Sequence, residues 1–194
     1  MTAPAVESHP LQPFLPPSAR VLMLGSFPPP RRRWCMDFFY PNYLNDMWRI
    51  VGLVFMGDKD AFVDVAAKRF RHQALVDWLS GQGLAFYDTA CRVRRLQGNA
   101  SDKFLEIVTP TDIEALVDHL PLCTAIAATG QKSAETLAAH YGIKPPAVGQ
   151  SVDINVAGRR LRFYRMPSTS RAYPAPLAAK AAAYEAMWRA EGLL

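Results

Sequence analysis

The chain has 194 residues, of which 50% are hydrophobic and 20% are charged, and its formal net charge is +5. A chain of this length and composition can bury one substantial core. We therefore expect a single domain over residues 1–194 and not a disordered electrostatic arm. The positive charge is compatible with a polyanionic partner but does not identify one, because many basic proteins bind no nucleic acid.

The cysteines and the first residues bear on location. Cys35, Cys91 and Cys123 are widely separated and form no CxxC pair, which argues against a disulfide framework, a zinc ribbon or a four-cysteine iron–sulfur cluster. A reduced, cytoplasmic setting fits this pattern best. The N-terminal residues lack a charged region followed by an apolar core, and no later stretch approaches about 18 uninterrupted apolar residues. We expect neither secretion nor a membrane partner.

Cofactor and metal motifs are missing from the sequence. It contains no Walker loop and no GxGxxG, so nucleotide cofactors have no support. The histidines show no metal-ligand spacing and are not expected in a functional cleft; they are His9, His72, His119 and His140. We expect no cofactor and no metal, and assign the histidines no chemistry.

The chain begins with a proline-rich segment, residues 1–18, which we expect to be an extended lead-in across the domain surface. Residues 20–24 form a short apolar run that stops at Gly25, as expected for a buried parallel strand entering a functional loop. The loop at 25–42 carries four prolines, three consecutive arginines and five aromatic residues. Because such a composition is costly near a surface unless it serves a purpose, we interpret this segment as the principal site loop.

Two helical patterns follow, at 44–55 and at 60–79, the second ending near Gly81. Residues 84–87 predict a second strand, with Asp88 at its carboxyl end. After a basic loop, Thr109, Pro110 and Asp112 supply a cap, a first-turn proline and an acidic position, which together predict the start of another helix.

The second half of the chain alternates in the same way. Residues 123–128 predict a strand that leads through Thr129 into a helix, and the runs at 152–156 and 160–165 predict a hairpin whose second arm continues into the sheet. A loop at 166–174 precedes a closing helix. Together these elements predict an α/β fold, a three-layer α/β/α sandwich with a mostly parallel central sheet of about four strands. Because ligands bind beyond the carboxyl ends of such strands, the loops there should form one cleft.

Five short motifs occur in order at these strand ends. They are GSFP at 25–28, FFYPNYLNDMW at 38–48, YDTACR at 87–92, ATGQKSAE at 128–135 and MPSTSRAY at 166–173. Together they resemble the hypoxanthine-DNA glycosylase-like branch of the uracil-DNA glycosylase superfamily, over about residues 20–188. The resemblance implies a metal-free enzyme of base-excision repair. Such an enzyme extrudes a damaged base from DNA and hydrolyses its glycosidic bond.

Two residues are candidates for catalysis. Asn45 occupies the position of the branch's catalytic asparagine, where an amide could orient water or hold the base. By residue type alone it would be a helix cap, but the flanking Tyr40 and Trp48 favour catalysis, and the two roles are not exclusive. Asp88, at a strand end, could activate water or stabilise positive charge on the sugar. A cap for the following segment is equally compatible with its position.

The base pocket is expected to come from the first loop. Phe39 and Tyr40 supply stacking surface, although either residue could simply belong to the core. The backbone amides of Gly25, Ser26 and Phe27 could receive a base carbonyl, since a glycine turn above a strand lets main-chain donors converge.

A hydroxyl-rich loop is expected to bind a DNA phosphate through hydroxyl and amide donors and a neighbouring positive charge. Its residues are Ser168, Thr169, Ser170 and Arg171. The alternative is an ordinary turn that caps the last helix. The chain departs from the branch here, because residues 170–173 read Ser-Arg-Ala-Tyr where the branch commonly has Ser-Pro-Ala-Asn.

The first loop departs from the branch at 29–35, which contains Arg31, Arg32 and Arg33 beside Trp34. This combination is suited to phosphates and exposed bases, whereas the alternative is a solvated basic turn.

The sequence therefore predicts a monomeric, cytoplasmic, monofunctional DNA glycosylase. Its partner is DNA with a damaged or mismatched base, and its reaction removes uracil or hypoxanthine and leaves an abasic site. Two alternatives stay open. One is a catalytically inactive nucleic-acid-binding homologue, and the other is a hydrolase of small nucleosides or nucleotides.

Overall fold

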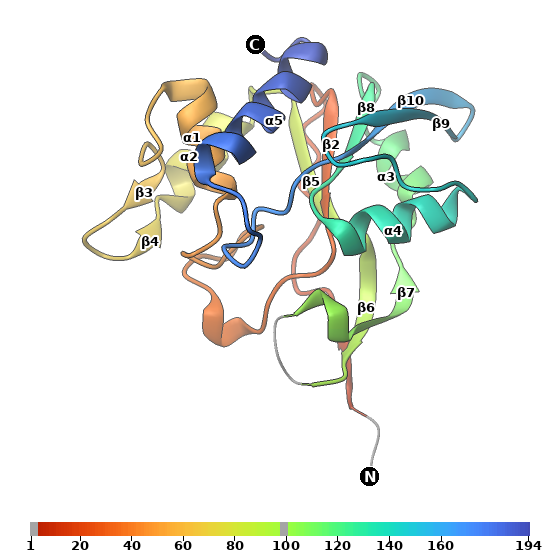
Figure 1. Ribbon diagram of the computed structural model, residues 1–194, viewed down its shortest axis with the longest axis horizontal. Coiled ribbons are helices and arrows are strands. Elements are labelled where there is room, and N and C mark those ends of the chain that lie inside the picture. Colours follow the sequence, from red (N-terminus) through yellow and green to blue (C-terminus); the bar gives the residue numbers. More distant parts are fainter. Residues whose placement is uncertain (1–3, 98–100) are drawn as a thin grey trace.

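The computed structural model describes residues 4–97 and 101–194. Its central sheet has five strands, in the order β5 (Leu84–Asp88), β2 (Val21–Gly25), β8 (Ala125–Ala128), β10 (Arg159–Arg165) and β9 (Ser151–Val156) (Figure 1). Strands β5, β2, β8 and β10 are parallel, and β9 is antiparallel to β10. The sheet is therefore mixed, which corrects the expectation of a mostly parallel sheet of about four strands.

The mixed character comes from the β9–β10 hairpin. Ala157 and Gly158 have φ angles of 48° and 78°, the left-handed conformations of a tight two-residue turn that reverses the chain. The hairpin expected at 152–165 is thus confirmed. Its first arm forms the outer edge of the sheet, where Val152 and Asp153 are exposed.

Helices lie on both sides of the central sheet. In Figure 1, α1 (Met47–Met56), α2 (His72–Leu79) and α5 (Leu177–Ala190) lie on one side, and α3 (Ile113–Asp118) and α4 (Gln131–His140) lie on the other. The Phe55 ring contacts the rings of Trp78 and Trp188, which joins α1 to α2 and α5. Trp48 and Trp188 are fully buried in the core. The layered α/β architecture expected from the alternating pattern is confirmed.

A second, antiparallel sheet was not predicted. It consists of β1 (Val6–Ser8), β6 (Ala90–Arg95) and β7 (Leu105–Pro110), in the order β1-β6-β7. Residues 90–95 were expected to be a basic loop, and the lead-in at 1–18, whose first three residues lie outside the described part of the chain, was expected to cross the surface. Instead Phe14 forms a bridge with Phe86 of β5, and Val93 and Leu105 pack with Phe27 in a small buried cluster.

The long helix expected at 60–79 is wrong in its first half. A hairpin of β3 (Val63–Asp64) and β4 (Arg69–Phe70) precedes α2. The Asp64 carboxylate accepts a hydrogen bond from the Ala67 amide at 3.0 Å, and Lys68 has a φ of 49°. Both features close a turn and stop a helix.

The start of α3 also differs from the expected one. Thr109 and Pro110 belong to β7, and the cap is Asp112, whose carboxylate accepts a hydrogen bond from the Ala115 amide at 2.9 Å. The helix still turns its expected residues, Ile113 and Leu116 among them, into the core.

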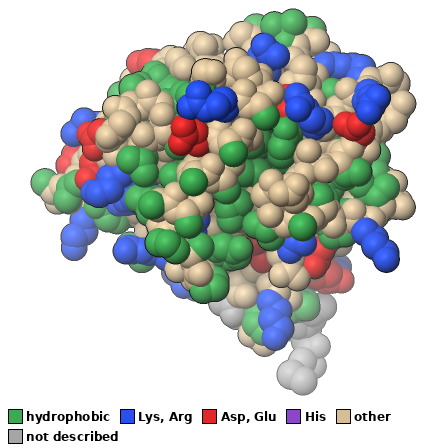
Figure 2. All heavy atoms as spheres, turned by 45° about the horizontal axis from the view of Figure 1, so that its top comes forward, with side chains coloured by type: hydrophobic (Ala, Val, Ile, Leu, Met, Phe, Trp, Pro, Cys, Tyr) green, Lys and Arg blue, Asp and Glu red, His purple; other side chains and the backbone are tan. Residues whose placement is uncertain are grey.

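Two short 3-10 helices, η1 (Arg31–Arg33) and η2 (Asp102–Phe104), lie in the segments that follow β2 and β6. On the face drawn in Figure 2, Lys and Arg side chains are scattered among Asp and Glu and do not merge into one patch. None of the helices in the described residues has both the length and the apolar character needed to cross a membrane.

Candidate active site

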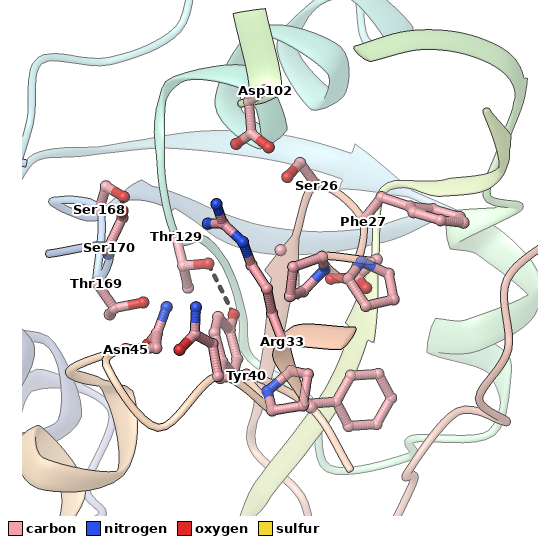
Figure 3. Close-up of a pocket in the computed structure, with 17 residues that line it drawn as sticks. Ser26, Phe27, Arg33, Tyr40, Asn45, Asp102, Thr129, Ser168, Thr169 and Ser170 are labelled. Atoms are coloured by element: carbon pink, nitrogen blue, oxygen red, sulfur yellow. Dashed lines mark hydrogen bonds between the residues drawn. The ribbon is translucent and has the colours of Figure 1, made fainter. Parts of the chain in front are cut away.

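A cavity of about 170 Å³ lies at the carboxyl ends of β2 and β5 (Figure 3). Most of the predicted site residues line it: Gly25, Ser26, Phe27, Arg33, Phe39, Tyr40, Asn45, Asp88, Ser168, Thr169 and Ser170. The other lining residues are Pro28, Pro29, Pro41, Asn42, Asp102 and Thr129. Arg31, Arg32 and Arg171 are exposed residues outside this lining. Segments distant in the sequence thus meet at one edge of the sheet.

Asn45 immediately precedes Asp46, the N-cap residue of α1, and it contributes to the cavity. Its side-chain oxygen accepts a hydrogen bond from the Met47 amide at 2.9 Å. Because a backbone N–H can only donate, this bond fixes which amide atom is the oxygen. The Asn45 NH₂ group is therefore the end left for the cavity, where Figure 3 shows the side chain near Thr169. Through this group the side chain can donate a hydrogen bond to a ligand, while its oxygen already accepts one bond.

Asp88 ends β5 and lies directly beside Gly25, its register partner in β2. A Cβ atom on Gly25 would collide with the Oδ1 atom of Asp88, so this close approach requires glycine. The backbone around Asp88 is also fixed, since its carbonyl accepts a hydrogen bond from the Thr111 hydroxyl at 2.6 Å. The Asp88 carboxylate is thus held at a defined place in the cavity wall.

His9 contacts the other oxygen of the same carboxylate. Its Nε2 atom lies 2.8 Å from Asp88 Oδ2, and the exposed fractions of the two side chains are 2% and 9%. The ring also packs against Phe27 and Tyr87, with centroids 5.2 and 4.6 Å apart. The expectation that no histidine lies near the cleft is therefore wrong for His9.

Tyr40 reaches across the cavity to Thr129. Thr129 Oγ1 donates to the Leu24 carbonyl at 3.2 Å, which leaves Tyr40 Oη to donate to Thr129 Oγ1 at 2.7 Å. Burial, and then the charge of Asp88, raises the pKa of the Tyr40 phenol, so this hydroxyl stays protonated at neutral pH. The backbone of Tyr40 has a φ of 49°, a conformation that is strained for an aromatic residue.

Phe39 is both a core residue and a cavity residue. It is 3% exposed, and its ring stacks on Phe86 with centroids 6.2 Å apart. Phe39 therefore belongs both to the core and to the pocket wall.

The two loops that carry Asn45 and Ser170 are joined by a buried ion pair. Lys180 of α5 is 1% exposed, and its Nζ atom lies 2.8 Å from Asp46 Oδ2 and donates to the Ser170 carbonyl at 2.9 Å. The Asp46 amide donates to the Thr169 carbonyl at 2.9 Å. These contacts fix the start of α1 relative to the hydroxyl-rich loop.

The three arginines of η1 have different surroundings. Arg31 pairs with Asp37 and stacks on Trp34, with its guanidinium carbon 4.1 Å from the ring centroid. Arg33 lines the cavity, and Figure 3 shows its guanidinium extended toward it. No hydrogen bond or ion pair joins its guanidinium to the residues that the structure describes. Arg33 is thus the arginine of this group best placed to meet a ligand.

Arg95 supports the first loop from behind. It pairs with Glu7, with its Nε atom 3.0 Å from Oε1, and it donates to the Pro28 carbonyl at 2.5 Å. Its guanidinium carbon also lies 5.5 Å from the centroid of Phe27. The N-terminal strand and β6 therefore brace the residues 27–28 that form part of the cavity wall.

Asp102 is a lining residue that sequence reasoning missed. The residue is exposed as a whole, but Figure 3 shows its carboxylate facing the Ser26 hydroxyl. Burial of the carboxyl group raises the pKa of Asp102; the hydrogen bond with Ser26 lowers it, and the charge of Asp88 raises it further. The cavity thus has two carboxylates, of which that of Asp88 belongs to a buried residue and that of Asp102 to an exposed one.

The missed residues share one cause. Asp102 and His9 belong to the unpredicted sheet and its connections, and a single histidine or aspartate in a polar segment carries no periodic signal. A usable hint was the short alternating pattern of residues 90–95, which is typical of a half-buried strand.

No protein-family model matches the chain, and no curated protein matches it either. Among solved structures, it is similar to the solution structure of a protein from Methanosarcina acetivorans described as a "putative Uracil DNA glycosylase". The TM-score is 0.62 and the identity 19%, with 96% of this chain and 99% of that chain covered. Because so low an identity carries information on architecture alone, the comparison shows that this chain has the fold of the Methanosarcina protein.

Proposed function

We propose that the protein is a monofunctional DNA glycosylase of base-excision repair. Its substrate is DNA with a deaminated base, uracil or hypoxanthine, extruded from the duplex into the cavity. Water adds to C1′ of the sugar, the N-glycosidic bond breaks, and the released base leaves an abasic site. No lysine takes part and no strand is cut.

One observation carries this proposal. The amide of Asn45 and the carboxylate of Asp88 line the same cavity, with Phe39 and Tyr40 in its wall. An extruded base needs a stacking surface, donors for its polar edge, and a group that handles the charge of the sugar. The described cavity offers each kind of group within one space. The order of the five motifs supports the same activity and the hypoxanthine-DNA glycosylase-like branch.

Asn45 is proposed to hold the base rather than to position water. Its NH₂ group is the free end of the amide, since the oxygen is occupied by the Met47 amide. An N–H donor suits a carbonyl oxygen of uracil or hypoxanthine, and it stabilises the negative charge that develops on the departing base. The backbone amides of Gly25, Ser26 and Phe27 are proposed to bind the same edge.

Asp88 is proposed to act on the sugar side. A carboxylate can orient the attacking water and stabilise the positive charge of an oxocarbenium-like transition state. Its Oδ1 atom lies against Gly25 at the cavity wall, and the carboxylate is largely shielded from bulk water. Electrostatic interactions are stronger in such surroundings than in water.

The DNA backbone is proposed to lie across two loops. Ser168, Thr169 and Ser170 supply hydroxyl and amide groups for a phosphate, and Arg171 adds an exposed charge beside them. On the other loop, Arg33 is proposed to make the main contact, with Arg31 and Arg32 at the periphery.

The test is base excision from oligonucleotides, followed by alkali cleavage at the abasic site. Single- and double-stranded substrates carry uracil, hypoxanthine, xanthine or a T mismatch, and free nucleosides are included. The expected result is release of uracil or hypoxanthine that is lost in both Asn45→Ala and Asp88→Ala variants. Retained DNA affinity without release of any base would contradict the proposal in favour of a binding protein. Turnover confined to free nucleosides would favour a small-molecule hydrolase.

A further inference from the structure

We propose that His9 is a positioning residue for Asp88, so that the N-terminal segment forms part of the catalytic apparatus. The inference rests on the proposed function for the role of Asp88. It concerns a residue to which the sequence assigns no chemistry and which lies 79 positions from its partner.

The contact between the two side chains is short and shielded. His9 Nε2 and Asp88 Oδ2 are 2.8 Å apart, and the side chains are 2% and 9% exposed. A hydrogen bond in such a site is stronger than one at the surface because water does not compete with it. The bond therefore constrains the orientation of the carboxylate, which water alone would leave free to rotate.

The imidazole ring is itself held on several sides. The His9 amide donates to the Cys91 carbonyl at 2.8 Å, which continues the pairing of β1 with β6. The ring packs against Phe27, Phe39 and Tyr87. A rigid donor of this kind transmits its own position to the carboxylate that it contacts.

The ionised Asp88 carboxylate can only accept, so His9 Nε2 is the donor in their bond, and the partners of the other ring nitrogen are compatible with this. His9 Nδ1 lies 3.2 Å from the Leu11 amide nitrogen and 3.0 Å from the Leu11 carbonyl oxygen. A neutral ring accepts from that amide at Nδ1, and a cationic ring donates to that carbonyl. In both states the proton on Nε2 is available for the Asp88 carboxylate. The donor function is therefore independent of the ring's charge.

The two oxygens of the Asp88 carboxylate have different surroundings. Oδ2 is occupied by His9, while Oδ1 faces Gly25 at the cavity wall. One oxygen is thus anchored from behind and the other remains for water or the sugar. This is the relationship expected between a catalytic acid–base group and the residue that orients it.

Other titratable and charged groups surround the pair. On the cavity side these are the Tyr40 phenol and the Asp102 carboxyl, whose pKa values are both raised in part by the charge of Asp88. The Tyr87 ring packs on His9, and its phenol lies 4.0 Å from the Cys91 thiol; Arg95, which pairs with Glu7, lies over the Phe27 ring. Because these groups would respond to a large change in packing, the first variant removes the N–H donor and keeps an aromatic ring at position 9.

The decisive variants are His9→Phe, which keeps an aromatic ring but has no donor, and His9→Gln, which keeps an N–H group. His119→Ala is the matched control, since His119 is exposed directly after α3, where its ring bonds the Ala115 carbonyl. Phe14→Ala controls for loosening of the lead-in, because Phe14 packs on Phe38 and Phe86 without contacting Asp88. Folding of each variant is checked by urea unfolding.

The first readout is independent of activity. The ¹³C chemical shift of the Asp88 carboxyl, assigned with Asp88→Asn, is compared among the variants at one neutral pH. Loss of the hydrogen bond to Oδ2 should shift this resonance in His9→Phe. The control variants and, in large part, His9→Gln should retain the wild-type resonance, although His9→Gln has no aromatic ring. An unchanged resonance in His9→Phe would overturn the proposal.

The second readout is the single-turnover rate of base excision. His9→Phe should lower this rate about 10- to 100-fold, the range for a lost hydrogen bond to a charged group, with DNA affinity unchanged and partial recovery in His9→Gln. A wild-type rate in folded His9→Phe would leave His9 a purely structural residue and refute its positioning role. If the wild-type protein excises no base, the proposed function fails, and the carboxyl resonance still decides whether His9 controls Asp88.

Discussion

Lys180 and Asp46 are separated by 134 positions in the sequence, yet their charged groups lie 2.8 Å apart. Because the same ammonium group donates to the Ser170 carbonyl, one side chain joins the start of α1 to the hydroxyl-rich loop. The geometry of Asn45 relative to Ser168 and Thr169 depends on this contact.

Replacement of Lys180 by methionine should therefore destabilise the protein and loosen both loops. Removing one member of a buried ion pair leaves the other charge uncompensated, which costs about 3–5 kcal/mol. The measurement is the free energy of unfolding in urea. The double variant Lys180→Met/Asp46→Asn should recover part of the loss, because no unpaired charge then remains. Equal stabilities of the single and double variants would show that the ion pair does not carry the effect.

Asn45→Asp separates the hydrogen bond to the Met47 amide from the proposed chemistry. A carboxylate still accepts the Met47 amide and is favoured near a helix N-terminus, so stability should match or exceed that of the wild type. The variant lacks the NH₂ donor, and its excision rate should fall about 100-fold or more. Asn45→Ala serves as the comparison, since it should also lose about 1 kcal/mol of stability with the bond to the Met47 amide. Wild-type excision by Asn45→Asp would mean that the amide nitrogen has no role.

Gly25→Ala tests the close approach of β2 to Asp88. The new methyl group would occupy the space of Asp88 Oδ1, so the carboxylate must turn away and excision should fall by about tenfold or more. The matched control is Gly81→Ala, because a Cβ at that position meets no atom within 4 Å. The control should leave excision unchanged. Comparable excision rates for the two variants would argue against a required position of the Asp88 carboxylate.

Arg33→Gln should weaken DNA binding in a way that depends on salt. Each phosphate that a protein neutralises contributes about 0.9 to the slope of log affinity against log salt concentration, so the slope should fall by about that amount. Arg160→Gln is the control, because Arg160 lies at the amino end of β10, away from the cavity edge, and pairs with Asp153. Binding of oligonucleotides by fluorescence anisotropy at several salt concentrations gives both slopes. Identical slopes for both variants would remove Arg33 from the interface.

Asp102→Asn gives a prediction about pH. Burial raises the pKa of Asp102 above its ordinary value of 3.8, so the folded protein binds this proton more tightly than the unfolded chain does. The contribution of Asp102 to the free energy of unfolding should therefore fall as pH rises above about 3.8, and the variant lacks this contribution. In urea unfolding between about pH 3 and 7, the free energy of unfolding of the variant should increase relative to that of the wild type as pH rises, and the difference should then reach a plateau. If the variant instead became more stable relative to the wild type as pH falls, the sign would be opposite and would contradict the raised pKa of Asp102.

The sequence predicted the elements whose pattern is strong and local. The apolar run at 20–24, the turn at Thr129 and the spacing in the closing helix correspond to β2, the start of α4 and α5. The rule that loops gather at the carboxyl ends of parallel strands then brought Gly25, Asp88 and Thr129 to one cavity. These predictions depend only on periodicity and on the geometry of parallel strands.

The parts that could not be predicted depend on pairing between distant segments. Val6 lies opposite Arg94 in an antiparallel pair. The three-residue strand β1 is too short to show a pattern, and the alternation at 90–95 does not indicate which segment pairs with it. The hairpin at 63–70 was hidden because its residues also fit a helical spacing, and the turn at Asp64 decided against the helix. His9 became visible as a site residue only once the β1–β6 pairing was known.

Tyr40 shows that a strained backbone can persist where the side chain stabilises more than the strain costs. Its left-handed backbone would be relaxed by glycine, which adopts this conformation without the roughly 1–3 kcal/mol of strain that other residues bear. Glycine would, however, remove both the ring that packs on Trp48 and Phe86 and the hydroxyl that reaches Thr129. Truncation of a large buried aromatic side chain costs about 3–5 kcal/mol, so even a laboratory selection for heat resistance alone would keep this tyrosine.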